Sequence, residues 1–145
     1  MLKRNEVMKK SITFIILTLS LALTACDKGD DLDEIFMNKS WTLAFFQEGV
    51  EKNSIKGDYK IRFYENVFTV TTPNKSSIEG YWEADNKTHA FRCPKKLRVT
   101  SGTIVGDTTA QKMINIFEKA TGYAGDANSL QIIEMPNKFM QFHNK

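Results

Sequence analysis

Apolar and polar residues alternate along most of the chain from Trp41 onward. Alternate side chains of a β-strand point to opposite faces of a sheet, so this period of two predicts half-buried strands. The clearest strand is residues 78–85, in which every second residue is apolar or small and the residues between them are mostly acidic. Five further segments carry similar inward-facing sets: Trp41-Leu43-Phe45, Tyr59-Ile61-Phe63, Phe68-Val70, Phe91-Cys93 and Leu97-Val99.

One segment, residues 107–120, follows the period of a helix instead. Its apolar residues recur at intervals of three and four, which places them on one helical face: Met113, Ile116, Phe117 and Ala120. Asp107 is a suitable N-cap, and Gly122 is a suitable C-terminal stop. We therefore expect a single helix in this region.

After the helix, residues 130–134 and 139–143 are expected to form a hairpin around Pro136-Asn137. Short strands joined by short turns indicate antiparallel pairing. The predicted fold is α+β and mainly antiparallel β, with about eight strands in a meander or partly closed barrel. The helix is inserted before the last two strands.

The first 25 residues have the organisation of an export signal. Four basic residues precede an apolar run over residues 12–23, and the run ends in Leu23-Thr24-Ala25-Cys26. The uncharged stretch is 15 residues long, whereas a helix that crosses a bilayer needs roughly 18 to 20. This arrangement resembles a bacterial lipoprotein signal, with either Met1 or Met8 as the start.

The lipoprotein resemblance implies that residues 1–25 are removed and that the sulfur of Cys26 is lipidated. The membrane would then be a partner through the lipid anchor. Residues 26–35 hold five acids between Asp27 and Glu34, and such dense like charge predicts an extended tether. The tract resembles the acidic signal of lipoproteins at the outer surface, which predicts an outer-membrane lipoprotein of the cell envelope. Asp27 alone also resembles an inner-membrane retention signal, so the membrane face stays open.

Charge and cysteine content limit the function further. The leader holds four of the 20 basic and one of the 17 acidic residues, so the mature chain is formally neutral. An overall basic field that attracts nucleic acid is therefore absent, and we expect no nucleic-acid partner.

With Cys26 acylated, Cys93 has no partner within the chain. It is buried, paired between chains or reactive, and burial is the commonest state of a free cysteine.

Residues 36–145 also resemble META-type domains and small lipocalin-like lipoproteins. The residues behind this resemblance are the opening Trp41-Thr42-Leu43, the central hairpin of residues 78–93, the segment 125–132 after the helix, and the closing Met140-Gln141-Phe142. The resemblance implies a small, nearly closed antiparallel sheet with a packed helix and no established enzymatic activity.

A search for catalytic residues finds no set with suitable spacing. The only histidines are His89 and His143, and His89 would lie about 13 Å from Cys93 along one strand, too far for a nucleophile and its base. Metal-binding, redox and phosphate-binding motifs are absent from the sequence. We therefore expect neither an enzyme nor a cofactor or metal site.

Two groups of residues are candidates for partner contact. Arg92, Lys95 and Lys96 form a short basic run. Phe46, Tyr64 and Tyr81 occupy outward positions of their strands, where exposed rings bind sugars or partners unless the helix or a loop covers them. The leader, the acidic tether, the strand-rich domain and the absence of a catalytic set predict a non-catalytic, lipid-anchored binding or interaction module whose partner is an envelope protein or a glycan. The alternative is a carrier of a small apolar ligand inside a lipocalin-like barrel.

Overall fold

The computed structural model describes residues 31–144. This part contains two helices, α2 (Asp31–Phe36) and α3 (Thr108–Lys119), and eleven strands. The strands are β1 (Ser40–Glu48), β2 (Glu51–Ser54), β3 (Lys60–Phe63), β4 (Val67–Thr71), β5 (Ser77–Tyr81), β6 (Glu83–Asp85), β7 (Ala90–Arg92), β8 (Arg98–Ser101), β9 (Gly122–Gly125), β10 (Ser129–Met135) and β11 (Lys138–Asn144).

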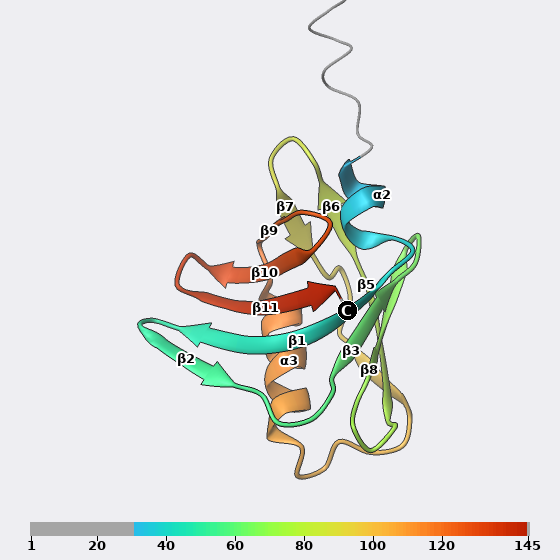
Figure 1. Ribbon diagram of the computed structural model, residues 1–145. Helices are drawn as coiled ribbons and strands as arrows, with labels where there is room; N and C mark the ends of the chain where they lie inside the picture. The colour runs from blue at the N-terminus through green and yellow to red at the C-terminus, as the bar shows by residue number, and fades with distance from the viewer. Residues whose placement is uncertain (1–30, 145) are drawn as a thin grey trace, which may run out of the picture. The chain divides into compact units, whose positions relative to one another are not determined.

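The strands form one curled antiparallel sheet in the order β6-β7-β9-β10-β11-β1-β3-β4-β5-β8, with β2 paired to β1 (Figure 1). Only Trp82 separates β5 from β6, so the run 77–85 pairs with β4 at one end of this order and with β7 at the other. The run 77–85 therefore links the two ends of the strand order. The prediction of a mainly antiparallel, partly closed sheet with one main helix before the last strands is confirmed.

The strand count is higher than predicted for two reasons. The expected strand 78–85 is interrupted at Trp82, whose backbone N–H donates to the carbonyl oxygen of Asn66 instead. In addition, β2 and β9 are present although neither has an alternating apolar pattern. Gly122, expected to stop the helix, begins β9, and α3 ends at Lys119.

Helix α3 packs on the inner side of the curled sheet, as predicted from its apolar face (Figure 1). Its N-cap is Asp107, whose carboxylate accepts a hydrogen bond of 2.9 Å from the backbone N–H of Ala110. Phe117 lies 4.6 Å from Phe68 and 6.4 Å from Phe142, measured between ring centroids. The helix thus closes the core with aromatic contacts.

Residues 31–35, expected to belong to an extended tether, instead form most of helix α2. The reason is the apolar end of this segment. Phe36 is fully buried, and its ring lies 4.8 to 5.9 Å from four other rings, those of Phe63, Trp82, Phe91 and Tyr123. The gain from burying this ring outweighs the repulsion among the nearby acids.

The inward face of β1 also differs from the expected one. A β-bulge between Leu43 and Phe45 shifts the register of β1 against β11. Because a shift of one residue reverses the faces of a strand, Phe46 points inward and is 3% exposed, whereas Phe45 is half-buried on the outer face. The expectation of an outward Phe46 is wrong, and Lys112 of α3 covers its ring at 4.8 Å.

The expected inward set Leu97-Val99 is only partly confirmed. Leu97 packs against the core, but Val99 is 39% exposed. Val99 belongs to β8, the last strand on one edge of the sheet, and all four residues of β8 are exposed.

Candidate functional site

The outer surface of β3, β4, β5 and β8 brings together most of the candidate contact residues. Because strand neighbours share a face, the cross-strand partners Arg62, Thr69, Glu79 and Arg98 form one outward row. A second row runs from Tyr64 through Val67 to Tyr81. We call this surface the basic–aromatic face and define it by Lys60, Arg62, Tyr64, Tyr81, Lys95 and Arg98.

Two tyrosines give this face its aromatic character. Val67 lies between them, since it accepts a hydrogen bond from the backbone N–H of Tyr64 and is the strand partner of Tyr81. Two strand spacings correspond to about 10 Å between the tyrosine backbones. Tyr64 is 48% exposed, and its carbonyl oxygen accepts a hydrogen bond of 2.8 Å from the indole nitrogen of the buried Trp82. The backbone beneath the Tyr64 ring is therefore fixed.

The cations of the face fall into two groups. Lys95 lies over the ring of Tyr81 at 4.6 Å, and Arg98 forms an ion pair of 3.0 Å with Glu79. By contrast, the side chains of Lys60 and Arg62 have no hydrogen-bond or ion-pair partner among residues 31–144. These two cations are therefore available to a ligand.

Lys60 and Arg62 line a shallow groove of about 260 Å³ on the outer side of the sheet. The other side chains of the groove are mostly hydroxyl-bearing: Ser40, Tyr64, Thr69 and Thr71. Strands β1, β3 and β4 position them, because the buried Ile61 and Phe63 alternate with the exposed residues of β3. The groove thus combines positive charge, hydroxyl groups and one exposed ring.

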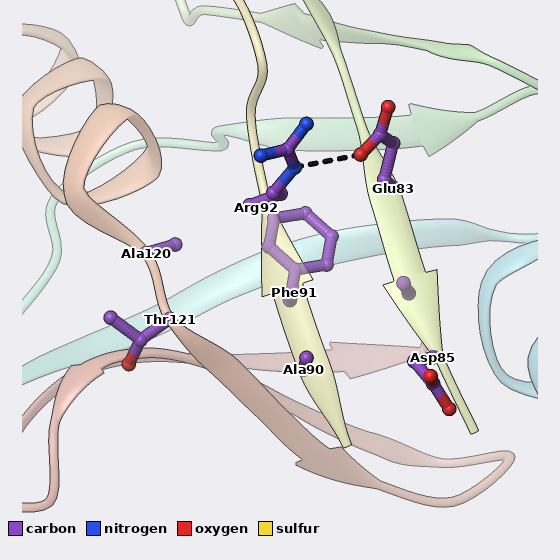
Figure 2. A pocket seen from close by; sticks show the side chains of 8 residues that line it. Glu83, Asp85, Ala90, Phe91, Arg92, Ala120 and Thr121 are labelled. Atoms are coloured by element: carbon purple, nitrogen blue, oxygen red, sulfur yellow. Dashed lines mark hydrogen bonds and ion pairs between the residues drawn. The ribbon is translucent and has the colours of Figure 1, made fainter. Parts of the chain in front are cut away.

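Arg92, also a predicted contact residue, lies apart from this face on β7. It forms an ion pair of 2.7 Å with Glu83 at the rim of a cleft of about 430 Å³. Figure 2 shows Ala120 and Thr121 on one side of the cleft and the strands β6 and β7 on the other. Asp85 and Thr121 are its other polar lining residues, and three of its eight lining residues are alanines. The cleft offers contact area but no unpaired cation, and no sequence pattern indicated it.

Lys96 is exposed, next to Lys95 in the connection between β7 and β8. The structure therefore places Tyr64, Tyr81 and Lys95 on one face, with Lys96 beside it, and separates Arg92 and Phe46 from them. Sequence reasoning missed Lys60 and Arg62, although their alternation with Ile61 and Phe63 predicted that they point outward.

The thiol of Cys93 is unsuited to nucleophilic chemistry. It packs against the core, and burial together with the nearby Glu118 carboxylate raises its pKa to about 12. A thiol with so high a pKa is almost entirely protonated at neutral pH. Among residues 31–144, no group of three potential metal-ligating side chains comes together.

A second cluster of charges lies where α3 meets the ends of β1, β10 and β11. Lys112 pairs with Glu48, and Lys138 pairs with Glu134 at 3.0 Å. Burial, and secondly the charge of Lys138, lower the pKa of Lys112. Because each lysine already has a carboxylate partner, this cluster fastens the helix to the sheet and is not a free binding site.

The lipidation residue Cys26 and the lipobox residues Leu23, Thr24 and Ala25 lie outside the described residues. Within residues 31–144, neither helix has the length and apolar character required to span a bilayer.

Comparison with known proteins gives a family and a fold. No curated protein matches the chain significantly. A crystal structure of a DUF4847 family protein from Bacteroides vulgatus is similar, with a TM-score of 0.60 and 21% sequence identity over 77% of this chain and 96% of that one. The NMR structure of a protein from Burkholderia xenovorans has a TM-score of 0.59 and 10% identity over 79% of this chain and 86% of that one. Similarity at these identities shows the fold alone.

Residues 27–144 match the family described as "Domain of unknown function (DUF4847)". The match begins directly after Cys26 and includes every described helix and strand. The chain therefore belongs to the DUF4847 family.

Proposed function

We propose that this protein is a non-catalytic, lipid-anchored binding module of the cell envelope, held in the outer membrane and contacting its partner through the basic–aromatic face. The observation that carries the proposal is the basic and apolar leader that ends in Leu23-Thr24-Ala25-Cys26. The resemblance to small lipocalin-like and META-type lipoproteins agrees with this function.

The chemistry of the described side chains supports a binding role over an enzymatic one. The half-buried Cys93 thiol has a pKa raised to about 12 by burial and the nearby Glu118, which favours the unreactive protonated form. The imidazole ring of His89 packs beside the ring of Tyr123, with 5.3 Å between the ring centroids. Within residues 31–144, the groove beside Lys60 and Arg62 has unpaired donors suited to recognition, and its lining includes no carboxylate or histidine.

The packing of the interior weighs against the alternative of a carrier. Phe36, Phe63 and Trp82 lie within 5.2 Å of one another at the centre of the sheet, measured between ring centroids. Phe91 and Phe117 extend the same cluster. An apolar ligand would have to displace these rings, so we do not propose a carrier.

Metabolic labelling with an alkyne-bearing palmitate tests the anchor. We expect labelling of the wild-type protein and of Cys93→Ser, and none of Cys26→Ser. Labelling of Cys26→Ser, or an unlabelled wild-type protein that keeps residues 1–25, would overturn the proposal. Protease added to intact cells then determines the face: digestion supports surface display, and full protection restricts partners to the inside of the envelope.

A further inference from the structure

The groove on the basic–aromatic face has three kinds of group within one small surface. Lys60 and Arg62 supply positive charge, and neither has a partner among the described residues. Ser40, Thr69 and Thr71 supply hydroxyl groups, and Tyr64 supplies a ring that is 48% exposed. A ligand that satisfies all of them must carry negative charge, many hydrogen-bonding groups and a face that can pack on a ring.

A carboxylate suits the donors of this groove. The guanidinium of Arg62 is planar and presents a fork of donors that matches a carboxylate in a bidentate pair. Lys60 and Arg62 alternate with the buried Ile61, so both side chains leave the same face of β3.

The two tyrosines indicate an extended ligand. Tyr64 and Tyr81 lie in one row about two strand spacings, or about 10 Å, apart. Lys95, over the ring of Tyr81, adds a cation at the far end of this row, whereas Arg98 is paired with Glu79. A chain of several sugar rings reaches from the groove to Tyr81, whereas a single small anion does not.

The composition of the face favours a polysaccharide over a lipid surface. Proteins that insert into a membrane surface present a continuous apolar face beside their basic residues. Here the only aliphatic residue between the two tyrosines is the half-buried Val67, and its neighbours in the next row are polar. Two acids lie on or near this face: Glu65 follows Tyr64, and Glu79 is opposite Thr69. Their negative charge offsets that of the neighbouring cations, so the net positive charge is greatest at Lys60 and Arg62.

We propose that the basic–aromatic face binds an acidic polysaccharide built of uronic acids, with Arg62 and Lys60 on a carboxylate and Tyr64 under a sugar ring. This proposal rests on the proposed function, since an envelope location gives the domain access to such polymers. Hydroxyl groups of the sugar would bond to Ser40, Thr69 and Thr71. Tyr81 and Lys95 would contact sugar residues farther along the polymer.

Binding of hexagalacturonate to the purified full chain in detergent tests the proposal, with fully methyl-esterified hexagalacturonate as the uncharged probe. We expect binding of the acid and at least tenfold weaker binding of the ester. Lys60→Gln with Arg62→Gln should weaken binding of the acid about tenfold or more. Tyr64→Ala should weaken it as well, and Tyr64→Phe should retain it because the ring is kept. Urea unfolding midpoints confirm that each variant is folded.

The matched control is the pair Lys87→Gln and Lys119→Gln, which removes the same charge from exposed positions away from the face. Equal weakening by the control pair, equal binding of the ester, or no binding of the acid would overturn the proposal. Binding to phosphatidylglycerol vesicles without binding to hexagalacturonate would overturn it in favour of a lipid surface. If palmitate labels Cys26 while hexagalacturonate fails to bind, only the polysaccharide assignment falls, and the lipid-anchored module stands.

Discussion

Replacing Phe36 by alanine tests whether the segment after the leader is part of the folded domain. Helix α2 holds this side chain at the centre of the aromatic cluster, where it is fully buried. The substitution removes a ring that lies 4.8 Å from Trp82 and 5.0 Å from both Phe63 and Tyr123. It leaves a cavity that the surrounding rings can fill only in part.

The expected loss is large relative to the stability of a domain of this size. Phenylalanine-to-alanine changes in a protein core cost about 3–5 kcal/mol, and the free energy of unfolding of a typical domain is about 5–15 kcal/mol. We expect Phe36→Ala to fall near the middle of the first range, because three of its four ring neighbours lie in strands and the fourth, Trp82, is fixed by its hydrogen bond to Tyr64. Phe36→Leu, which fills part of the space, should lose less.

Urea unfolding followed by tryptophan fluorescence measures this loss. With a slope of about 1–3 kcal/mol per molar urea, the midpoint of Phe36→Ala should fall by roughly 1–4 M while the slope is unchanged. The control is Glu34→Ala on the exposed side of the same helix, which should change stability by no more than about 0.5 kcal/mol. If Phe36→Ala is as stable as Glu34→Ala, then residues 31–36 are not docked in the core and the reasoning is refuted.

Three further predictions concern single groups in the fold. Gly80→Ala should destabilise the domain by about 1–3 kcal/mol, because a Cβ there would lie 2.4 Å from the Phe68 ring. Adding Phe68→Leu to this variant removes the ring atoms in the way and should recover part of the lost stability, as measured by urea unfolding. The hydroxyl of Tyr59 donates to Asp107 at 2.7 Å, and burial and this bond raise its pKa from 10.0 to about 12. Stability from Tyr59 should therefore be complete below pH 10 and decline as the pH rises towards 12, and Tyr59→Phe should reduce this decline in unfolding measured against pH. The pKa of Cys93 is raised to about 12, so its thiol should react with iodoacetamide at pH 8 far more slowly in the native protein than in urea. Equal rates in the two states would show that the thiol is exposed.

Much of the fold was predictable from periodicity, because strands and helices bury one face at a characteristic spacing. Residues 59–63 alternate strictly, and Tyr59, Ile61 and Phe63 are all buried as expected. The face of α3 and its cap at Asp107 were likewise evident from the sequence. These elements are regular, so local pattern and tertiary packing agree.

The failures of prediction occur where tertiary contacts override the local pattern. The bulge before Phe45 depends on pairing with β11 and leaves no mark in the sequence of β1. Helix α2 is too short and too acidic to be stable by itself, and it forms because Phe36 enters the aromatic cluster. Strand β9 contains two glycines and one large apolar residue, and its pairing with β10 defines it.

The candidate site was predictable only in part for a related reason. Tyr64 and Tyr81 were identified as outward-facing residues of separate strands, but their common row follows from the pairing of β3, β4 and β5. The importance of Lys60 and Arg62 depends on their having no ion-pair partner within residues 31–144, which the linear sequence does not reveal. Long-range pairing, not composition, assembles this surface.

The position of helix α2 limits the distance between the folded domain and a membrane. Asp31 begins the helix, five residues after Cys26, and a fully extended chain spans at most about 3.3–3.6 Å per residue, or roughly 18 Å here. A lipid at Cys26 would therefore keep the first residue of α2 within roughly 18 Å of the anchored residue. With so short a connection, the domain would contact polymers that lie along the membrane surface, and it would not contact molecules held far above that surface.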